Sequence, residues 1–148
     1  MKLHKHFILT LALAATALGV TASRAAAAEM YKATFNLPVE AYWGSTLMHP
    51  GEYSISMEWD YAGSSLVYLR GENVHAVILT GSVNLETASE NSHLTLEEVN
   101  GAYVVRELKA GSLGKDFRFG VSKAVRRQTD RASNGAPMNV PVTAGGGN

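Results

Sequence analysis

Cysteine is absent from this chain of 148 residues. The absence excludes disulfide bonds, thiolate metal sites and cysteine nucleophiles, and it leaves no residue to which a lipoprotein anchor could be attached. An oxidising compartment would therefore give the protein no covalent support. We expect its stability to come from apolar side chains buried in one core, for which the chain is long enough.

Sequence patterns for catalysis are also lacking. The chain has no Gly-x-Ser-x-Gly segment. The neighbours Glu97 and Glu98 would point to opposite faces of a strand, so they cannot act as a carboxylate pair. After residue 28 the histidines are His49, His75 and His93, without the close spacing that brings two metal ligands together on one strand or helix. These absences predict a protein that is not an enzyme and that needs no cofactor.

No metal site is predicted either. Met48 and His49 come nearest to one, because thioether and imidazole groups suit copper. Met57 could add a third ligand, but it lies on the apolar face of its expected strand and is expected to fill the core.

The first 28 residues have the layout of a secretory signal peptide. A short basic start precedes an uncharged apolar run from 7 to 20, which is shorter than the ~20 residues needed to span a bilayer. Ala26-Ala27-Ala28 then forms an A-x-A cleavage pattern before Glu29. We predict that residues 1–28 are removed and that the rest is exported to the periplasm or the extracellular space, without membrane integration. An uncleaved anchor is the alternative.

Charge is unevenly distributed along the chain, although its formal net charge is zero. Residues 1–28 hold three basic residues and no acidic one, residues 29–122 are acidic, and residues 123–148 are basic. Nucleic-acid binding needs a basic face, so no nucleic-acid partner is expected for the folded part. The basic end predicts either a solvated terminus or a segment that adheres to an anionic envelope.

Period-two alternation of apolar and polar residues, the pattern of a half-buried β-strand, dominates the chain after the leader. Segment 31–37 alternates in this way and stops at Pro38, which places it at a strand end or a sheet edge. Segment 52–60 is the best example, and its apolar face, extended by one tyrosine, is expected in the core: Tyr53, Ile55, Met57, Trp59 and Tyr61.

Two hairpins are predicted. The apolar runs 66–69 and 76–79 are joined through Arg70-Gly71-Glu72-Asn73, and because they are apolar on both sides we expect two central strands that are covered on both faces. The dipeptide Asn100-Gly101 fits a two-residue type I′ turn.

The register of the second hairpin follows from its turn. With Asn100-Gly101 at the tip, Leu96 pairs with Val105 and Leu94 with Glu107. Thr95 then faces Arg106, and Glu97 lies on the diagonal within reach of the Arg106 guanidinium.

The end of the chain changes in character. Alternation over 117–122 predicts the last strand, and the polar segment 81–92 predicts a long loop. From Lys123 onward there is no aromatic residue, while prolines and a glycine run are present. This composition predicts a mobile basic tail over 123–148, with a helical turn or two within 121–131 as the alternative.

Seven or eight short strands, with no helical pattern after the leader, predict an all-β protein. We expect an antiparallel β-sandwich, with a small β-barrel as the alternative. The predicted organisation is a signal peptide over 1–28, the sandwich domain over 29–122 and the tail over 123–148.

The opening of the mature chain resembles that of small exported bacterial proteins whose function is not established. Phe35-Asn36-Leu37-Pro38-Val39-Glu40, then Trp43-Gly44, then Leu47 with Gly51-Glu52-Tyr53 are similar to their F-x-L-P-x-E, W-G and L-x-x-G-x-Y pattern. The last element also resembles transthyretin-like and other prealbumin-type sandwich modules, although Met48-His49-Pro50-Gly51 replaces their Pro-Ala-Gly. The resemblance covers about a fifth of the mature chain and implies export and a sandwich, with no catalytic function.

Tyr42 and Trp43 straddle a strand end, so one of their rings is expected to face solvent. With Glu40 they are the candidate binding residues. We predict a non-enzymatic exported module that binds a partner protein or a glycan at the cell envelope. The alternatives are a carbohydrate-binding or sugar-active module that uses Trp43 and Glu40, and a structural subunit that pairs with another chain through an edge strand.

Overall fold

The structure is a computed structural model that describes residues 29–59, 65–127 and 135–145. The predicted signal peptide over 1–28 and the predicted core residue Tyr61 lie outside the described residues. In chain order the described elements are β1 (Glu29–Leu37), β2 (Ala41–Trp43), β3 (Thr46–Met48), β4 (Gly51–Trp59), β5 (Ser65–Gly71), β6 (His75–Leu79), β7 (Ser82–Leu85), β8 (Ser92–Val99), β9 (Ala102–Ala110), the 3-10 helix η1 (Gly111–Leu113), β10 (Lys115–Arg118), α2 (Lys123–Arg127) and β11 (Met138–Ala144).

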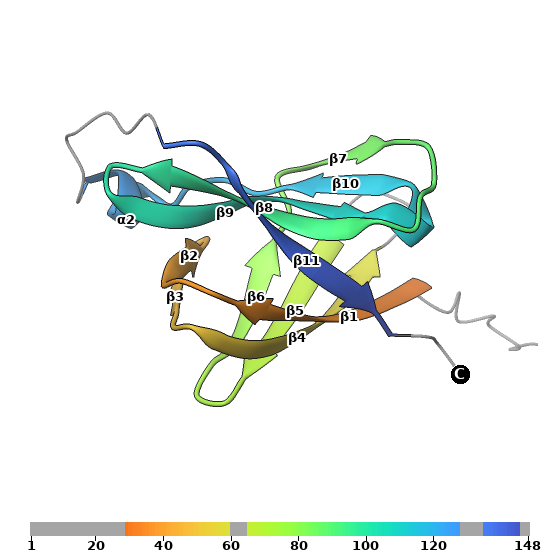
Figure 1. The fold of residues 1–148 in the computed structure, drawn as a ribbon, viewed down its shortest axis with the longest axis horizontal. Coiled ribbons are helices and arrows are strands. Elements are labelled where there is room, and N and C mark those ends of the chain that lie inside the picture. The colour runs from red at the N-terminus through yellow and green to blue at the C-terminus, as the bar shows by residue number, and fades with distance from the viewer. Residues whose placement is uncertain (1–28, 60–64, 128–134, 146–148) are drawn as a thin grey trace, which may run out of the picture.

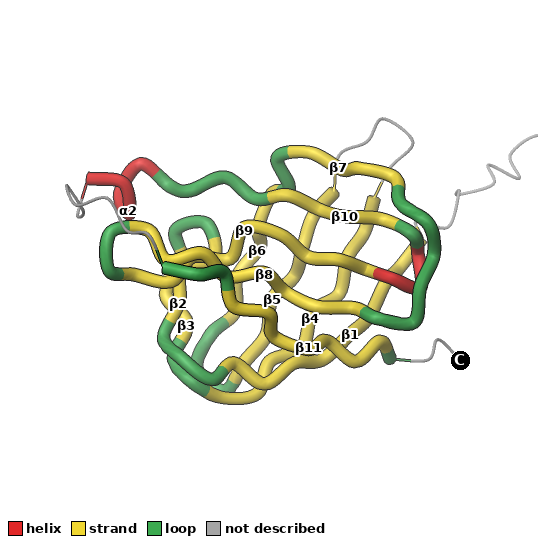
Figure 2. Tube along the Cα trace, turned by 45° about the horizontal axis from the view of Figure 1, so that its top comes forward, coloured by secondary structure: helices red, strands yellow, loops and turns green. Residues whose placement is uncertain are grey.

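All strands belong to one mixed sheet. Its order is β3-β2-β9-β8-β11-β1-β4-β5-β6, with β10 also paired to β9 and β7 paired to β10. Only β2 and β9 run parallel among the described pairs. Figure 1 shows β8, β9 and β10 above β1, β4, β5 and β6, with β11 crossing between the two groups. The turned view of Figure 2 shows the strands curling around a common interior.

The all-β prediction is confirmed, because the described residues lie mostly in strands. These strands form a mixed sheet that is nearly a barrel. The finer prediction, a sandwich of seven or eight strands, is not confirmed.

The core fills the space between the two groups of strands. Phe35 stacks on Tyr53 with the ring centroids 5.5 Å apart, and Trp43 meets Phe119 edge to face at 5.0 Å. Such contacts add to the burial of apolar surface, which is the main stabilising term of a fold without disulfides.

The alternation predicted for 52–60 is confirmed in β4. Tyr53, Ile55 and Met57 are buried, and Trp59 is half-buried. Their neighbours on the other face remain accessible, so β4 presents a polar surface outward.

The preceding strand β1 ends at Leu37, directly before Pro38, because proline has no N–H to continue the ladder.

The hairpin of β8 and β9 confirms the predicted turn. Asn100 has φ 59° and Gly101 has φ 84°, the positive values that a type I′ turn requires. Leu96 pairs with Val105 as predicted.

One part of the predicted register is wrong. Leu94 lies opposite Leu108 and not Glu107, and Thr95 lies opposite Glu107 and not Arg106. The register shifts between Thr95 and Leu96, and this β-bulge leaves Arg106 as the extra residue of β9. The Arg106 Nε atom nevertheless donates to Glu97 Oε2 at 3.1 Å, so the predicted contact is confirmed.

The predicted tail is wrong for residues 138–144, which form β11 in the interior of the sheet. β11 pairs with β8 on one side and with β1 on the other, and Val140 and Val142 are buried. Pro141 is tolerated because pairing with β1 begins only at Val142, so the strand has a single neighbour at the proline. The predicted domain boundary at residue 122 is therefore also wrong, whereas the alternative of a helical turn is confirmed by α2.

The predicted loop 81–92 contains strand β7, which pairs with β10. The strand was predicted as a loop because β7 is almost fully exposed: only its Val83 is partly buried. Exposed polar residues gave no alternation from which to predict the strand.

The first predicted hairpin is confirmed as β5 and β6, and a Cβ added at Gly71 would collide with the Tyr53 ring. The prediction that both strands are central is wrong for β6, which ends the sheet order. Val77 and Leu79 on its outer side are 60% and 71% exposed. The apolar character of β6 therefore does not reflect cover on both faces.

Candidate functional site

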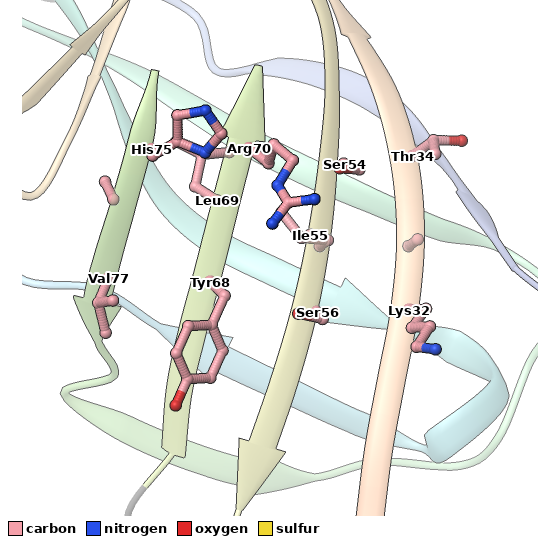
Figure 3. Close-up of a pocket in the computed structure, with 12 residues that line it drawn as sticks. Lys32, Thr34, Ser54, Ile55, Ser56, Tyr68, Leu69, Arg70, His75 and Val77 are labelled. Carbon is pink, nitrogen blue, oxygen red and sulfur yellow. The ribbon is translucent and has the colours of Figure 1, made fainter. Parts of the chain in front are cut away.

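The outer face of β1, β4, β5 and β6 forms the candidate site. Register places its side chains in two neighbouring rows that cross the four strands. One row contains Thr34, Ser54, Arg70 and His75, and the other contains Lys32, Ser56, Tyr68 and Val77. Figure 3 shows these side chains standing on the same side of the sheet.

These rows line a shallow hollow of about 620 Å³. Because neighbouring strands lie about 4.8 Å apart, side chains from all four strands line this one hollow. Thr34, Ser54 and Ser56 supply hydroxyl groups that can both donate and accept hydrogen bonds. The lining therefore combines hydrogen-bonding side chains with apolar surface.

Two cations stand at this hollow. Lys32 and Arg70 are exposed, and neither forms an ion pair with another described residue. Figure 3 shows the Arg70 side chain extending from β5 toward β4. His75 is opposite Arg70 in the ladder and adds a donor or acceptor at the same edge. The arrangement can hold an anionic group between fixed hydroxyls.

Tyr68 borders the hollow and is hydrogen-bonded at its far end. Its hydroxyl donates to Glu58 Oε2 at 3.3 Å. The negative charge of Glu58 raises the pKa of Tyr68, with smaller contributions from desolvation and from this hydrogen bond. The phenol therefore stays protonated and keeps the Glu58 carboxylate engaged, while the ring covers the floor beside Ser56.

An adjoining hollow of about 750 Å³ continues the face toward β11. It shares Thr34, Ser54 and Arg70 with the first hollow and adds Glu52 and Glu72. Arg70 thus stands between a basic region and an acidic one. A ligand with negative charge only at one end would be oriented by this contrast.

The structure places the predicted binding residues elsewhere. Trp43 is completely buried, so the expectation that its ring presents a face to a sugar is wrong. Its ring lies in the core because β2 is sandwiched between β3 and β9 and packs against Phe119. Tyr42 is half-buried. Glu40 is exposed, and its Oε2 atom lies 2.9 Å from Nδ1 of His49, so the two side chains engage each other.

Met48 and His49 are not brought together as metal ligands. Met48 is completely buried while the neighbouring His49 is exposed, since successive side chains of an extended segment point to opposite faces. Within 29–59, 65–127 and 135–145, no three His, Asp or Glu side chains gather closely enough to hold a metal ion.

The sequence carried a partial signal for the site. Lys32, Thr34, Ser54 and Ser56 belong to the polar faces of strands that alternation predicts. The sequence did not show that the polar faces of β1, β4 and β5 lie side by side. The register between strands that are distant in the sequence depends on the whole sheet.

Searches against protein families, curated proteins and solved structures found no match to this chain. Neither helix in the described ranges has the length and apolar character that crossing a bilayer requires.

Proposed function

We propose that the protein is an exported, non-enzymatic binding module whose ligand is an acidic glycan, held on the outer face of β1, β4, β5 and β6. The observation that carries this proposal is the pair Lys32 and Arg70, which lack an ion-pair partner among the described residues and share a hollow with three hydroxyl side chains. Export rests on the leader pattern of residues 1–28.

The side-chain chemistry favours a carboxylated or sulfated polymer. Arginine can bind a carboxylate or sulfate through two parallel hydrogen bonds, and lysine adds a point charge. Hydroxyls of Thr34, Ser54 and Ser56 match the hydroxyls of a sugar, and the ring of Tyr68 offers an apolar surface. A shallow, open hollow suits a chain that lies across the sheet.

The local charge also supports an acidic ligand. Residues 29–122 are acidic as a whole, and yet this hollow has two cations at its lining. Long-range repulsion by the rest of the protein would weaken the association, so binding depends on direct contact with Lys32 and Arg70.

The sandwich description and the resemblance to transthyretin-like modules belong to the same proposal. Two groups of strands facing each other across one core are compatible with a sandwich origin of this nearly closed barrel. A sugar site built on Trp43 is not proposed, because that ring is buried.

Isothermal titration calorimetry with polygalacturonate, and with neutral dextran of similar length, tests the function. We expect heat of binding for the acidic polymer only, with an affinity that falls as salt is raised. The double variant Lys32→Ala, Arg70→Ala removes both charges and should weaken binding about tenfold or more, since each lost charge-assisted hydrogen bond is worth about 1.5 kcal/mol.

The matched control is Lys123→Ala, Arg126→Ala, which removes two exposed basic residues of α2. Its affinity should stay within about twofold of that of the unmodified protein, because no residue of α2 lines the two hollows and coupling between distant sites is small. Equal binding by the Lys32→Ala, Arg70→Ala variant, or equal binding of dextran, would overturn the proposed function.

A further inference from the structure

Strand β6 has an unpaired edge that is defined by its backbone hydrogen bonds. The N–H of Gly71 donates to the Val74 carbonyl at 2.8 Å, and the N–H of Thr80 donates to the Ser65 carbonyl at 3.2 Å. Bonded pairs alternate along an antiparallel ladder, so His75, Val77 and Leu79, between Val74 and Thr80, direct their N–H and C=O groups away from β5. Within the described residues no other strand pairs with this edge.

The side chains at this edge are apolar and uncharged. Val77 and Leu79 are 60% and 71% exposed, and β6 contains no Lys, Arg, Asp or Glu. Edge strands of monomeric proteins are commonly protected by charged residues or proline, which discourage pairing with another chain. β6 has neither, so nothing in its sequence opposes the addition of a strand.

A further hollow, of about 440 Å³, lies beside the same strand. It is lined by Val77 to Gly81, by the turn between β2 and β3, and by residues 120–122. None of the lining residues is charged. The hollow beside β6 therefore presents an uncharged surface to an added segment.

We propose that the occupant of this edge is β6 of a second copy, which pairs antiparallel about a twofold axis through Val77. Pairing of the strand with its own copy meets no charge repulsion, since its only ionisable residue is His75. His75 would face Leu79 of the second copy, and Val77 would face Val77, so no two like charges are apposed.

The pairing extends the outer face across the axis. Val77 lies next to Tyr68 in the ladder, so two tyrosines and two valines would form one continuous apolar row. Up to about six backbone hydrogen bonds would join the two strands. A pair of five-residue strands makes a small interface, and the dimer is accordingly weak and dependent on concentration.

Sedimentation velocity of the mature chain over a wide range of concentrations tests the pairing. We expect a reversible dimer that disappears in the Val77→Lys variant, which places two like charges directly opposite each other. Because Val77 is exposed, the variant should keep its fold, as circular dichroism would check. The control is Leu85→Lys on β7, where an 81% exposed leucine sits on another edge strand.

The absence of cysteine allows a second test that does not depend on affinity. A hydrogen-bonded antiparallel pair has Cα atoms about 5.5 Å apart, within the range a disulfide spans. Val77→Cys should form a covalent dimer on mild oxidation several times faster than Leu85→Cys. A protein that stays monomeric at every concentration, a Val77→Lys variant that still forms dimers, or a dimer lost only in Leu85→Lys would overturn the proposal. None of these measurements involves a glycan, so their failure leaves the ligand proposal to its own test.

Discussion

The two outer faces of this barrel-like sheet use charge in different ways. On the face of β8, β9 and β10, both arginines are paired with carboxylates. Glu97 binds Arg106 at 3.1 Å, and Arg118 Nε lies 3.3 Å from Glu107 Oε2. Lys115 of β10 instead reaches the other group of strands, where its Nζ atom lies 4.3 Å from the centroid of the Trp59 ring.

On the face of β1, β4, β5 and β6, the cations Lys32 and Arg70 have no ion-pair partner among the described residues. The difference separates two roles that a count of charges cannot distinguish. A cation with a fixed partner contributes to stability, while a cation without one remains available to a ligand.

The largest effect should come from breaking the strand that both faces share. Val140 of β11 is 2% exposed and lies opposite Leu94 of β8. Val140→Asp would bury a carboxylate in the core, and we expect the free energy of unfolding to fall by at least about 3 kcal/mol. Urea unfolding followed by circular dichroism measures this. Because β11 links β8 to β1, one cooperative transition is expected, and two separate transitions would show that the faces fold independently.

A smaller effect on stability is expected at Arg106, the arginine that has fixed partners. Arg106 donates to Glu97 and also, through Nη1, to the Phe119 carbonyl at 2.9 Å. Arg106→Ala should lower the free energy of unfolding by about 1–2 kcal/mol. Arg70→Ala removes the same side chain from the opposite face and should change stability by less than about 0.5 kcal/mol. Similar losses for the two variants would contradict the division of roles.

The smallest effect is expected at the exposed pair of Arg118 and Glu107, where the arginine side chain is 62% exposed. Glu107→Gln keeps the shape and removes the charge, so stability should change by about 0.5 kcal/mol or less. Thermal unfolding at low and high salt would measure it, and the difference should shrink at high salt. A loss above that of Arg106→Ala would reverse the order of the two pairs.

Sequence reasoning succeeded where structure is set by neighbouring residues. Alternation identified β1 and β4, and the dipeptide Asn100-Gly101 identified the turn of β8 and β9. It failed at Arg106, because the bulge that shifts the register arises from packing of the two strands and leaves no mark in the hairpin sequence.

The missed strand β11 had a readable pattern. Met138, Val140 and Val142 alternate with residues that are exposed in the structure, but Pro141 and the following glycines suggested a segment without structure. A proline excludes a strand position only when both neighbours need its N–H. At Pro141 one side is unpaired, a circumstance that depends on where β1 ends its pairing and cannot be read locally.

The residues of the candidate site also could not be predicted from local sequence. Trp43 was predicted as a binding residue because aromatic rings at strand ends often reach solvent, yet the parallel pairing of β2 with β9 places it in the core. Lys32 and Arg70 are far apart in sequence and line the same hollow, on either side of β4, only when three strands are in register. Surfaces composed of several strands therefore require the sheet before they can be recognised.

The position of β11 also bears on the order in which the sheet can assemble. Residues 138–144 fill the place between β8 and β1, so β8 and β1 are joined into one sheet only when this strand has paired with both of them. Pairing between distant parts of a chain is slow in any case. β11 follows both of its partner strands along the chain, so its pairing is expected to be a late step in folding.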